Sequence, residues 1–196
     1  MLHQCFNIVL GLLLIIQIFL LIRLCARPQK SKTELFILGS GGHTREMLHI
    51  LSLVKPTDPI FVHADSDILS KDLTSKIYQE SKFIPIVRAR QVKQSYFTSI
   101  FSTVHALFKS FKIIYDTKPS LLISNGPGTA LPLMLSAWIL TKLNFINCKT
   151  VFVESYCRIQ HLSLTGKLCK FFVNEFVVNW EGIHKKGMKY IELYPK

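Results

Sequence analysis

Short apolar runs alternate with segments of helical periodicity along most of this chain, and this alternation restricts the fold more than any other feature. The runs predicted as strands are residues 34–38, 60–62, 83–87, 121–124, 150–153 and 176–178. The segments with a helical apolar stripe are residues 44–54, 67–78, 96–115, 130–143 and 163–172. Short continuous apolar strands joined by helices are typical of a parallel sheet covered on both faces. The sequence therefore predicts an α/β fold with a Rossmann-like, mostly parallel sheet.

Two elements need further comment. Pro85 lies inside a predicted strand, and because proline cannot donate a ladder hydrogen bond, that strand is expected at a sheet edge or at a bulge. Residues 130–143 are apolar on nearly every face, but the run is short and is interrupted by Pro132 and Lys142. We therefore expect a helix packed against the sheet there, not a membrane span.

The N-terminal segment differs from the rest of the chain. Hydrophobic residues make up 49% of the sequence, and residues 5–22 form one nearly continuous apolar run. A helix over that run is about 27 Å long, close to the roughly 30 Å of a bilayer core. Positive charges follow the run at once and none precede it: Arg23, Arg27, Lys30 and Lys32.

The position of these charges predicts a single-pass anchor with a lumenal N-terminus and a domain on the cytosolic face. A cleaved signal peptide is the alternative, and it fits less well because the run has no basic segment before it. The expected division is a membrane anchor with a basic linker over residues 1–32 and one Rossmann-like domain over residues 33–196.

Charge and cysteine content restrict the function classes. The chain has 24 Lys and Arg against 12 Asp and Glu, a net charge of +12, which favours an anionic partner. Nucleic acid is not expected, because the sequence has no zinc finger, RNA-recognition signature or basic recognition helix. The 5 cysteines show no Cys-x-x-Cys spacing, so neither a disulfide framework nor a metal site is predicted.

The first candidate site is a glycine-rich segment between a predicted strand and a predicted helix. It consists of Gly39, Ser40, Gly41, Gly42, His43 and Thr44. Glycines let backbone N–H groups approach a phosphate, and a helix N-terminus favours negative charge. The segment lacks the third glycine of a dinucleotide fingerprint and the Lys of a P-loop. It predicts an anion or diphosphate cradle, with His43 as a donor or base; the alternative is a tight turn that His43 or Thr44 caps.

Two further segments end predicted strands. Asn125, Gly126 and Gly128 lie in a glycine turn that can approach a sugar, although a plain β-turn accounts for them equally well. Glu154, followed by Ser155 and Arg158, can accept a proton from a sugar hydroxyl or hold that hydroxyl. An ion pair with Arg158 or a helix cap is the alternative for Glu154. Because ligands of parallel sheets bind at the carboxyl ends of the strands, we expect the three segments to converge.

Other charged residues are open to two interpretations. Asp67 can contact a ribose or, more simply, cap the following helix. A set of basic residues can face lipid headgroups or a diphosphate, or can be solvated: Arg88, Arg90, Lys93, Lys109 and Lys112.

The order of these motifs resembles a known family. The segments GSGGHT (39–44), SNGPGTALP (124–132) and VESYCRIQHLSLTGK (153–167) stand in the family's order behind one N-terminal anchor, and residues 92–95 are also similar. The family is the membrane-anchor subunit of the two-component N-acetylglucosaminyltransferase of asparagine-linked glycosylation. The likeness covers nearly the whole chain after residue 33.

This resemblance implies the N-terminal half of a GT-B glycosyltransferase, akin to the bacterial enzyme that adds N-acetylglucosamine to a lipid-linked muramyl peptide. A soluble subunit would supply the donor-binding half, making a heterodimer or larger complex. The pair would transfer N-acetylglucosamine from UDP-N-acetylglucosamine to dolichyl-diphosphate-N-acetylglucosamine at the endoplasmic reticulum membrane, by an inverting reaction and without a cofactor. One domain of this size forms one wall of such a cleft, so the chain alone is expected to be inactive.

The resemblance also implies residue roles. Gly41, Gly42 and His43 would cradle the acceptor diphosphate, while Asn125 and the glycines after it would line the acceptor side. Glu154 or His43 would be the base. The C-terminus departs from the family pattern, because the chain ends Tyr194-Pro195-Lys196 where a hydrophobic end is usual, and this tail would dock the soluble subunit.

Two other functions are compatible with the residues. One is a non-catalytic membrane scaffold whose glycine loops are structural only. The other is a self-sufficient nucleotide-sugar or dinucleotide enzyme.

Overall fold

The computed structural model describes residues 2–25, 31–88 and 96–193, and its centre is one parallel sheet. The strands are β1 (Glu34–Ile37), β2 (Pro59–Ala64), β3 (Lys82–Ile86), β4 (Leu121–Ser124), β5 (Lys149–Val153), β6 (Glu175–Val178) and β7 (Lys189–Tyr190). Neighbouring strands are all parallel and follow the order β3-β2-β1-β4-β5-β6-β7. The predicted parallel α/β class is confirmed.

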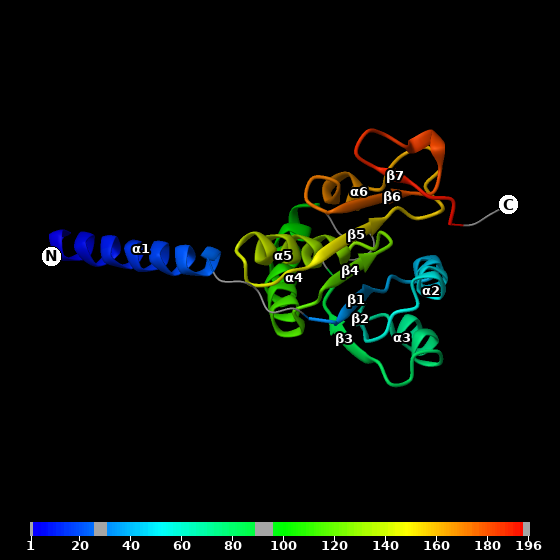
Figure 1. Cartoon of the computed structure of the whole chain (residues 1–196), viewed down its shortest axis with the longest axis horizontal. Coiled ribbons are helices and arrows are strands. Elements are labelled where there is room, and N and C mark those ends of the chain that lie inside the picture. The colour runs from blue at the N-terminus through cyan, green and yellow to red at the C-terminus, as the bar shows by residue number, and fades with distance from the viewer. Residues whose placement is uncertain (1, 26–30, 89–95, 194–196) are drawn as a thin grey trace.

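Helices cover both faces of this sheet. The described helices are α1 (Leu2–Cys25), α2 (Gly42–Val54), α3 (Ile68–Ser75), α4 (Tyr96–Thr117), α5 (Ala130–Lys142) and α6 (Leu164–Cys169), together with the short 3-10 helix η1 (Glu181–Ile183). Figure 1 shows α2 and α3 on one face of the sheet and α4 and α5 on the other, while α1 extends away from this body.

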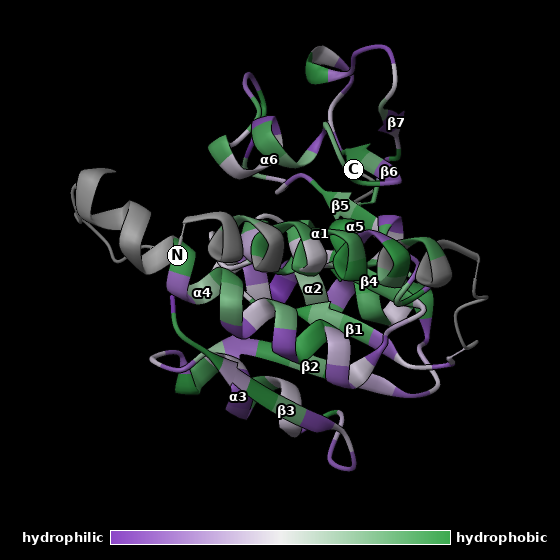
Figure 2. Cartoon of the chain, turned by 90° about the vertical axis from the view of Figure 1, so that its left-hand side faces the viewer, coloured by the Kyte–Doolittle hydropathy of each residue, from purple (hydrophilic) through white to green (hydrophobic). Residues whose placement is uncertain are grey.

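The apolar sequence of β1 explains why both faces are covered. Side chains of a strand point alternately to opposite faces, and all of β1 from Leu35 onward is fully buried. Leu35 and Ile37 belong to the core under α4 and α5, whereas Phe36 belongs to the core under α2. Figure 2 shows the same hydrophobic character along the central strands, with hydrophilic residues mostly on the outer loops.

Local sequence signals fix several element boundaries. Asp67 caps α3, because its carboxylate accepts a hydrogen bond from the Ser70 backbone N–H at 3.2 Å. Ser163 caps α6 by accepting from the Gly166 N–H at 2.9 Å. Pro85 lies in β3, which is an edge strand, as its lack of an N–H predicts. Asp67 is thus the helix cap that the simpler interpretation predicted.

Two elements differ from the sequence prediction. The helix expected over 163–172 is only Leu164–Cys169, and the chain adds a last edge strand, β7, that no apolar run announces. Strand β7 pairs in parallel with β6, and Glu175, at the start of β6, also forms ion pairs with Lys149 of β5 at 3.2 Å and with Lys189 of β7 at 2.5 Å. These two lysines hold the pKa of the Glu175 carboxyl below its ordinary value.

The N-terminal helix does not meet the expectation of a span over residues 5–22. In the stretches that the structure describes, no helix combines the length and the hydropathy that crossing a membrane requires. Helix α1 nevertheless exposes many apolar side chains, among them Phe6, Leu13, Ile15 and Phe19.

The C-terminal segment returns to the helix that begins at the glycine loop. The His49 Nε2 of α2 donates a hydrogen bond to the Leu193 carbonyl oxygen at 2.7 Å. The atypical tail, residues 194–196, lies outside the described residues, as do residues 92–95 and the basic residues Arg90 and Lys93.

Candidate functional site

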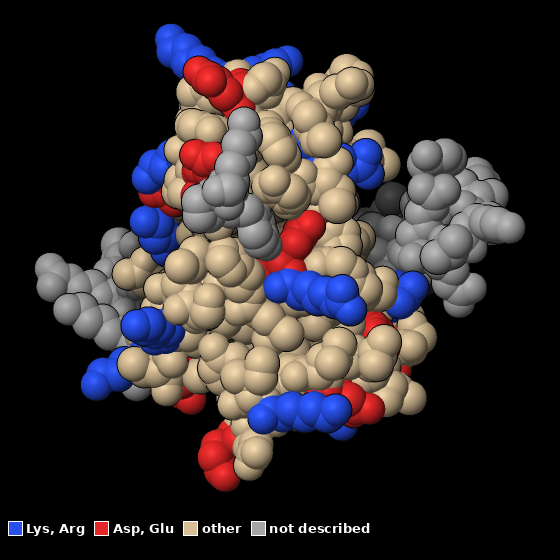
Figure 3. All heavy atoms as spheres, turned by 90° about the vertical axis from the view of Figure 1, so that its right-hand side faces the viewer, with Lys and Arg blue, Asp and Glu red and all other residues tan. Residues whose placement is uncertain are grey.

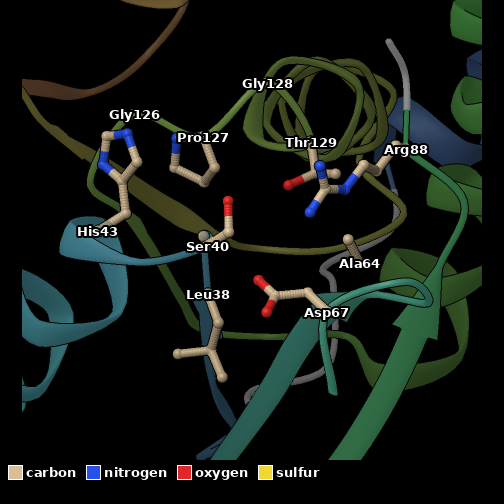
Figure 4. Close-up of a pocket in the computed structure, with 11 residues that line it drawn as sticks. Leu38, Ser40, His43, Ala64, Asp67, Arg88, Gly126, Pro127, Gly128 and Thr129 are labelled. Atoms are coloured by element: carbon tan, nitrogen blue, oxygen red, sulfur yellow. The ribbon is translucent and has the colours of Figure 1, made fainter. Parts of the chain in front are cut away.

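A pocket lies where β1, β2 and β4 end, with a volume of about 220 Å³. Its walls come from the loops that follow β1, β2 and β4 and from Arg88, just after β3 (Figure 4). The lining residues are Leu38, Gly39, Ser40, His43, Ala64, Asp67, Arg88, Gly126, Pro127, Gly128 and Thr129. The first two candidate segments therefore converge on one pocket, which is what parallel strand ends predict.

The register of the strands explains this convergence. Ile37 at the end of β1 pairs with Ser124 at the end of β4, so the glycine loop and the Asn125 turn leave the sheet side by side. They also interlock: a Cβ on Gly39 would lie 2.7 Å from the Pro127 Cβ and 2.9 Å from the His43 Cβ. Residue 39 must therefore be glycine for the two loops to approach as they do.

Within the first loop, exposed and buried residues have different roles. Ser40, Gly41 and Gly42 are exposed, and Gly41 has a φ of 65°, which glycine adopts without strain. Thr44 is 1% exposed, and its hydroxyl hydrogen-bonds the Gly39 carbonyl and lies 2.7 Å from the Ser70 Oγ. Thr44 therefore stabilises the loop from its buried side, and it does not line the pocket.

Arg88 supplies a cation to the pocket. It lines the pocket together with Ser40 of the glycine loop and with Thr129 (Figure 4). Of the three described residues in the basic set, Arg88, Lys109 and Lys112, it is Arg88 that lines the pocket beside the glycine loop. A guanidinium beside a loop with free N–H groups suits a phosphate oxygen. On the face shown in Figure 3, the Lys and Arg side chains are otherwise scattered and do not form one patch.

His43 is the exposed titratable group that the first loop brings to the pocket. Its side chain is 33% exposed, but Nδ1 is buried and makes no hydrogen bond within the described residues. The ring lies beside Gly126, where a Cβ would be 3.5 Å from the His43 Cε1 and φ is 103°. Because Nδ1 is enclosed, Nε2 is the ring nitrogen that a ligand can reach.

Asn125 does not face the pocket. It is fully buried, and its Nδ2 donates to the His43 carbonyl oxygen at 2.6 Å and to the Glu46 Oε2 at 3.2 Å. The amide thus fastens the second loop to the first. Gly126 and Gly128 do line the pocket.

Glu154 is also turned inward. It is 1% exposed, and its carboxylate accepts hydrogen bonds from the Ser155 N–H at 3.2 Å, the Ser163 N–H at 2.9 Å and the Ser163 Oγ at 3.2 Å. It closes the loop between β5 and α6. The alternative ion pair with Arg158 is not formed among the described residues, where Arg158 is exposed.

Sequence reasoning missed one residue that joins all three loops. Glu46, near the start of α2, accepts from Asn125 and also from the Ser155 Oγ at 2.8 Å. Its spacing of three residues from His43 was the available signal, since such pairs lie on the same face of a helix. The described stretches contain no group of three or more His, Cys, Asp or Glu side chains that could hold a metal ion.

Comparison with known proteins agrees with this arrangement of loops. The family model described as "Oligosaccharide biosynthesis protein Alg14 like" matches residues 34–193. This chain belongs to that family. The Alg14-like segment thus contains the whole sheet and all three loops, and the resemblance drawn from the motifs is confirmed.

Relatives in several eukaryotes support the same membership. The chain is 34% identical over 195 residues to a Homo sapiens protein named UDP-N-acetylglucosamine transferase subunit ALG14, covering 92% of this chain and 90% of the relative. It is also 34% identical to a Candida albicans protein of the same name, covering 81% of this chain and 74% of the relative.

A solved structure shares the fold. The crystal structure of Acinetobacter baumannii MurG superposes with a TM-score of 0.63 at 13% identity, over 81% of this chain. The Alg14-like chain covers 44% of the MurG chain, that is, less than half of it.

Proposed function

We propose that this chain is the membrane-attached, acceptor-side subunit of a two-component UDP-N-acetylglucosamine transferase. The pair would add the second N-acetylglucosamine to dolichyl-diphosphate-N-acetylglucosamine on the cytosolic face of the endoplasmic reticulum. The carrying observation is the match over 44% of a MurG chain, with the pocket on the strand ends and no second sheet in the described residues. That match supports one wall of a two-domain cleft, and because the relatives are named transferase subunits, a soluble partner would supply the donor site.

The acceptor would bind through its diphosphate. The exposed N–H groups around Ser40 and Gly41, together with the Arg88 guanidinium, form the part of the pocket with affinity for phosphate oxygens. Gly126 and Gly128 leave room for the sugar beside His43.

His43 is the base that the geometry favours over Glu154, because its ring reaches the pocket while the Glu154 carboxylate is occupied by loop donors. In an inverting displacement, the acceptor 4-hydroxyl oxygen attacks the donor C1 as its proton moves to His43. The bond from C1 to the UDP oxygen breaks, and UDP leaves with the electron pair.

Membrane attachment is a separate part of the proposal. The exposed apolar side chains of α1, among them Leu13, Ile16 and Phe19, would contact the lipid. Replacing these three residues by Gln is expected to release the chain from microsomes in flotation, whereas replacing the exposed Ile77 by Gln would leave it bound.

The catalytic proposal is tested with a transfer assay on three samples: this chain, its soluble partner, and the two mixed. UDP-N-acetylglucosamine is the donor and a lipid-diphosphate-N-acetylglucosamine the acceptor. Transfer only in the mixture is expected. Transfer by this chain alone would contradict the split-enzyme proposal and favour the self-sufficient enzyme.

A non-catalytic scaffold is the second candidate, and one observation favours it. Thr44, Asn125 and Glu154 are all buried, and each uses a polar group to hold the loops together. The scaffold predicts that His43→Ala leaves partnered transfer near wild type, whereas loss of a base costs about 10²- to 10⁴-fold.

A further inference from the structure

Glu46 is the acidic side chain on which the three loops meet. Its Oε1 accepts from the Ser155 Oγ at 2.8 Å, and its Oε2 accepts from the Asn125 Nδ2 at 3.2 Å. The side chain is 13% exposed. Two neutral donors from two different loops therefore fix both oxygens of a nearly buried carboxylate.

The same carboxylate faces the buried side of His43. Oε2 lies 3.9 Å from the His43 Nδ1, the nitrogen that has no hydrogen-bond partner in the described residues. A hydrogen bond needs about 2.7–3.2 Å, so a shift of about 1 Å would close the pair. Such contacts in enzymes without ligand are often long and shorten in the substrate complex.

We propose that Glu46 is a positioning residue for His43. The carboxylate holds the proton on Nδ1, which leaves the Nε2 lone pair free toward the pocket. This inference rests on the proposed function, because it matters only if His43 accepts the proton of the acceptor hydroxyl. After that transfer, the carboxylate stabilises the imidazolium, as the acid of a Ser-His-Asp triad does.

Other acidic residues near the pocket do not fit this role. Asp67 is engaged by the backbone and hydroxyl of Ser70, at 3.2 and 2.7 Å. Glu154 is engaged by the donors of its own loop. Among these three acids, Glu46 is the one whose carboxylate lies within 4 Å of the His43 ring nitrogen, at 3.9 Å. Asn125 donates to both the Glu46 carboxylate and the His43 carbonyl oxygen, which sets their relative position.

The first test observes the tautomer directly and needs no transfer activity. The full chain, labelled with ¹⁵N-histidine in detergent, is measured at about pH 8.5, where an ordinary histidine is neutral. The expected wild-type spectrum shows the proton of His43 on Nδ1, and Glu46→Gln moves it to Nε2. A wild-type spectrum with the proton on Nε2 would overturn the proposal, even if the variant did not fold.

The second test uses kinetics of the chain with its soluble partner. Glu46→Gln is expected to lower kcat at least about tenfold while both KM values change less than about threefold. The double variant with His43→Ala should be no slower, within about twofold, than His43→Ala alone, because the two residues act as one unit. A further loss of kcat in the double variant, beyond that of His43→Ala alone, would mean that Glu46 only holds the loops together.

Glu181→Gln is the matched control, because Glu181 is an exposed acid on the first turn of η1, away from the pocket. It should leave kcat unchanged. If the wild-type mixture shows no transfer, the proposed function fails, and the tautomer spectrum still decides whether Glu46 orients His43.

Discussion

Glu154 offers a direct test of whether an inward-facing carboxylate holds the site or takes part in the reaction. In the Glu154→Gln variant, the single amide oxygen can face either Ser155 or Ser163 but not both, so at least one buried N–H loses its acceptor. Loss of one hydrogen bond to a charged group costs about 1.5–3 kcal/mol. The Glu154→Ala variant loses all three bonds, and we expect about 3–5 kcal/mol.

The assay follows thermal unfolding of the full chain in detergent by tryptophan fluorescence. Trp180 is a local reporter, because its Nε1 donates to the Tyr156 carbonyl oxygen at 2.7 Å, inside the loop that Glu154 closes. At about 2–4 °C per kcal/mol for a domain of this size, Glu154→Gln should lower Tm by about 3–12 °C. Glu80→Gln, at an exposed position, is the control and should leave Tm unchanged.

Transfer by the same variants is measured well below their Tm. A loop-holding Glu154 predicts that Glu154→Gln keeps transfer within about tenfold of wild type, since the base is untouched. The reasoning would be refuted by an unchanged Tm together with a loss of transfer of about a hundredfold or more. That result would mean that the carboxylate leaves its loop donors and reaches the acceptor.

Three further predictions follow from the same structure. Gly39→Ala should cost about 1–3 kcal/mol of unfolding free energy in urea, because its Cβ would overlap Pro127, whereas Gly128→Ala, with nothing within 4 Å of the added Cβ, should change it by less than about 0.5; equal effects would contradict the interlock. Arg88→Gln should raise the KM for the lipid-diphosphate acceptor about tenfold or more at nearly constant kcat in the partnered assay, and an unchanged KM would remove Arg88 from the diphosphate site. Because the pKa of Glu175 is lowered in the folded chain, its contribution to stability is present above the ordinary value of 4.5 and is lost as pH falls through the lowered value. Urea unfolding between pH 3 and 6 should therefore show a weaker acid dependence for Glu175→Gln, and an identical dependence would contradict this assignment.

The fold was largely predictable because burial on both faces leaves a strong trace in sequence. A strand such as β1 reads as a continuous apolar run only when helices cover both sides, and the glycines that follow it mark where the chain turns. Strand β7 left no such trace, since it has only two residues, Lys189 and Tyr190, and both are exposed.

The site was predictable in position but not in side-chain direction. A polar residue after a strand can point toward a ligand or back to a neighbouring loop, and the sequence is the same in both cases. Asn125 and Glu154 both point back, because buried N–H and C=O groups of the adjacent loops need partners. The role of Glu46 depends on contacts with residues far along the chain, which helical spacing from His43 alone does not reveal.

Helix α2 carries His43 and Glu46 near its start and, further along, His49, which donates a hydrogen bond to the Leu193 carbonyl oxygen. At about 1.5 Å per residue, His43 and His49 are about 9 Å apart along one rigid rod. A protein that binds the residues around Leu193 would therefore act on the same helix that orients the His43 imidazole. Binding of the partner subunit would then change the orientation of His43 through helix α2, without any contact between the partner and the pocket.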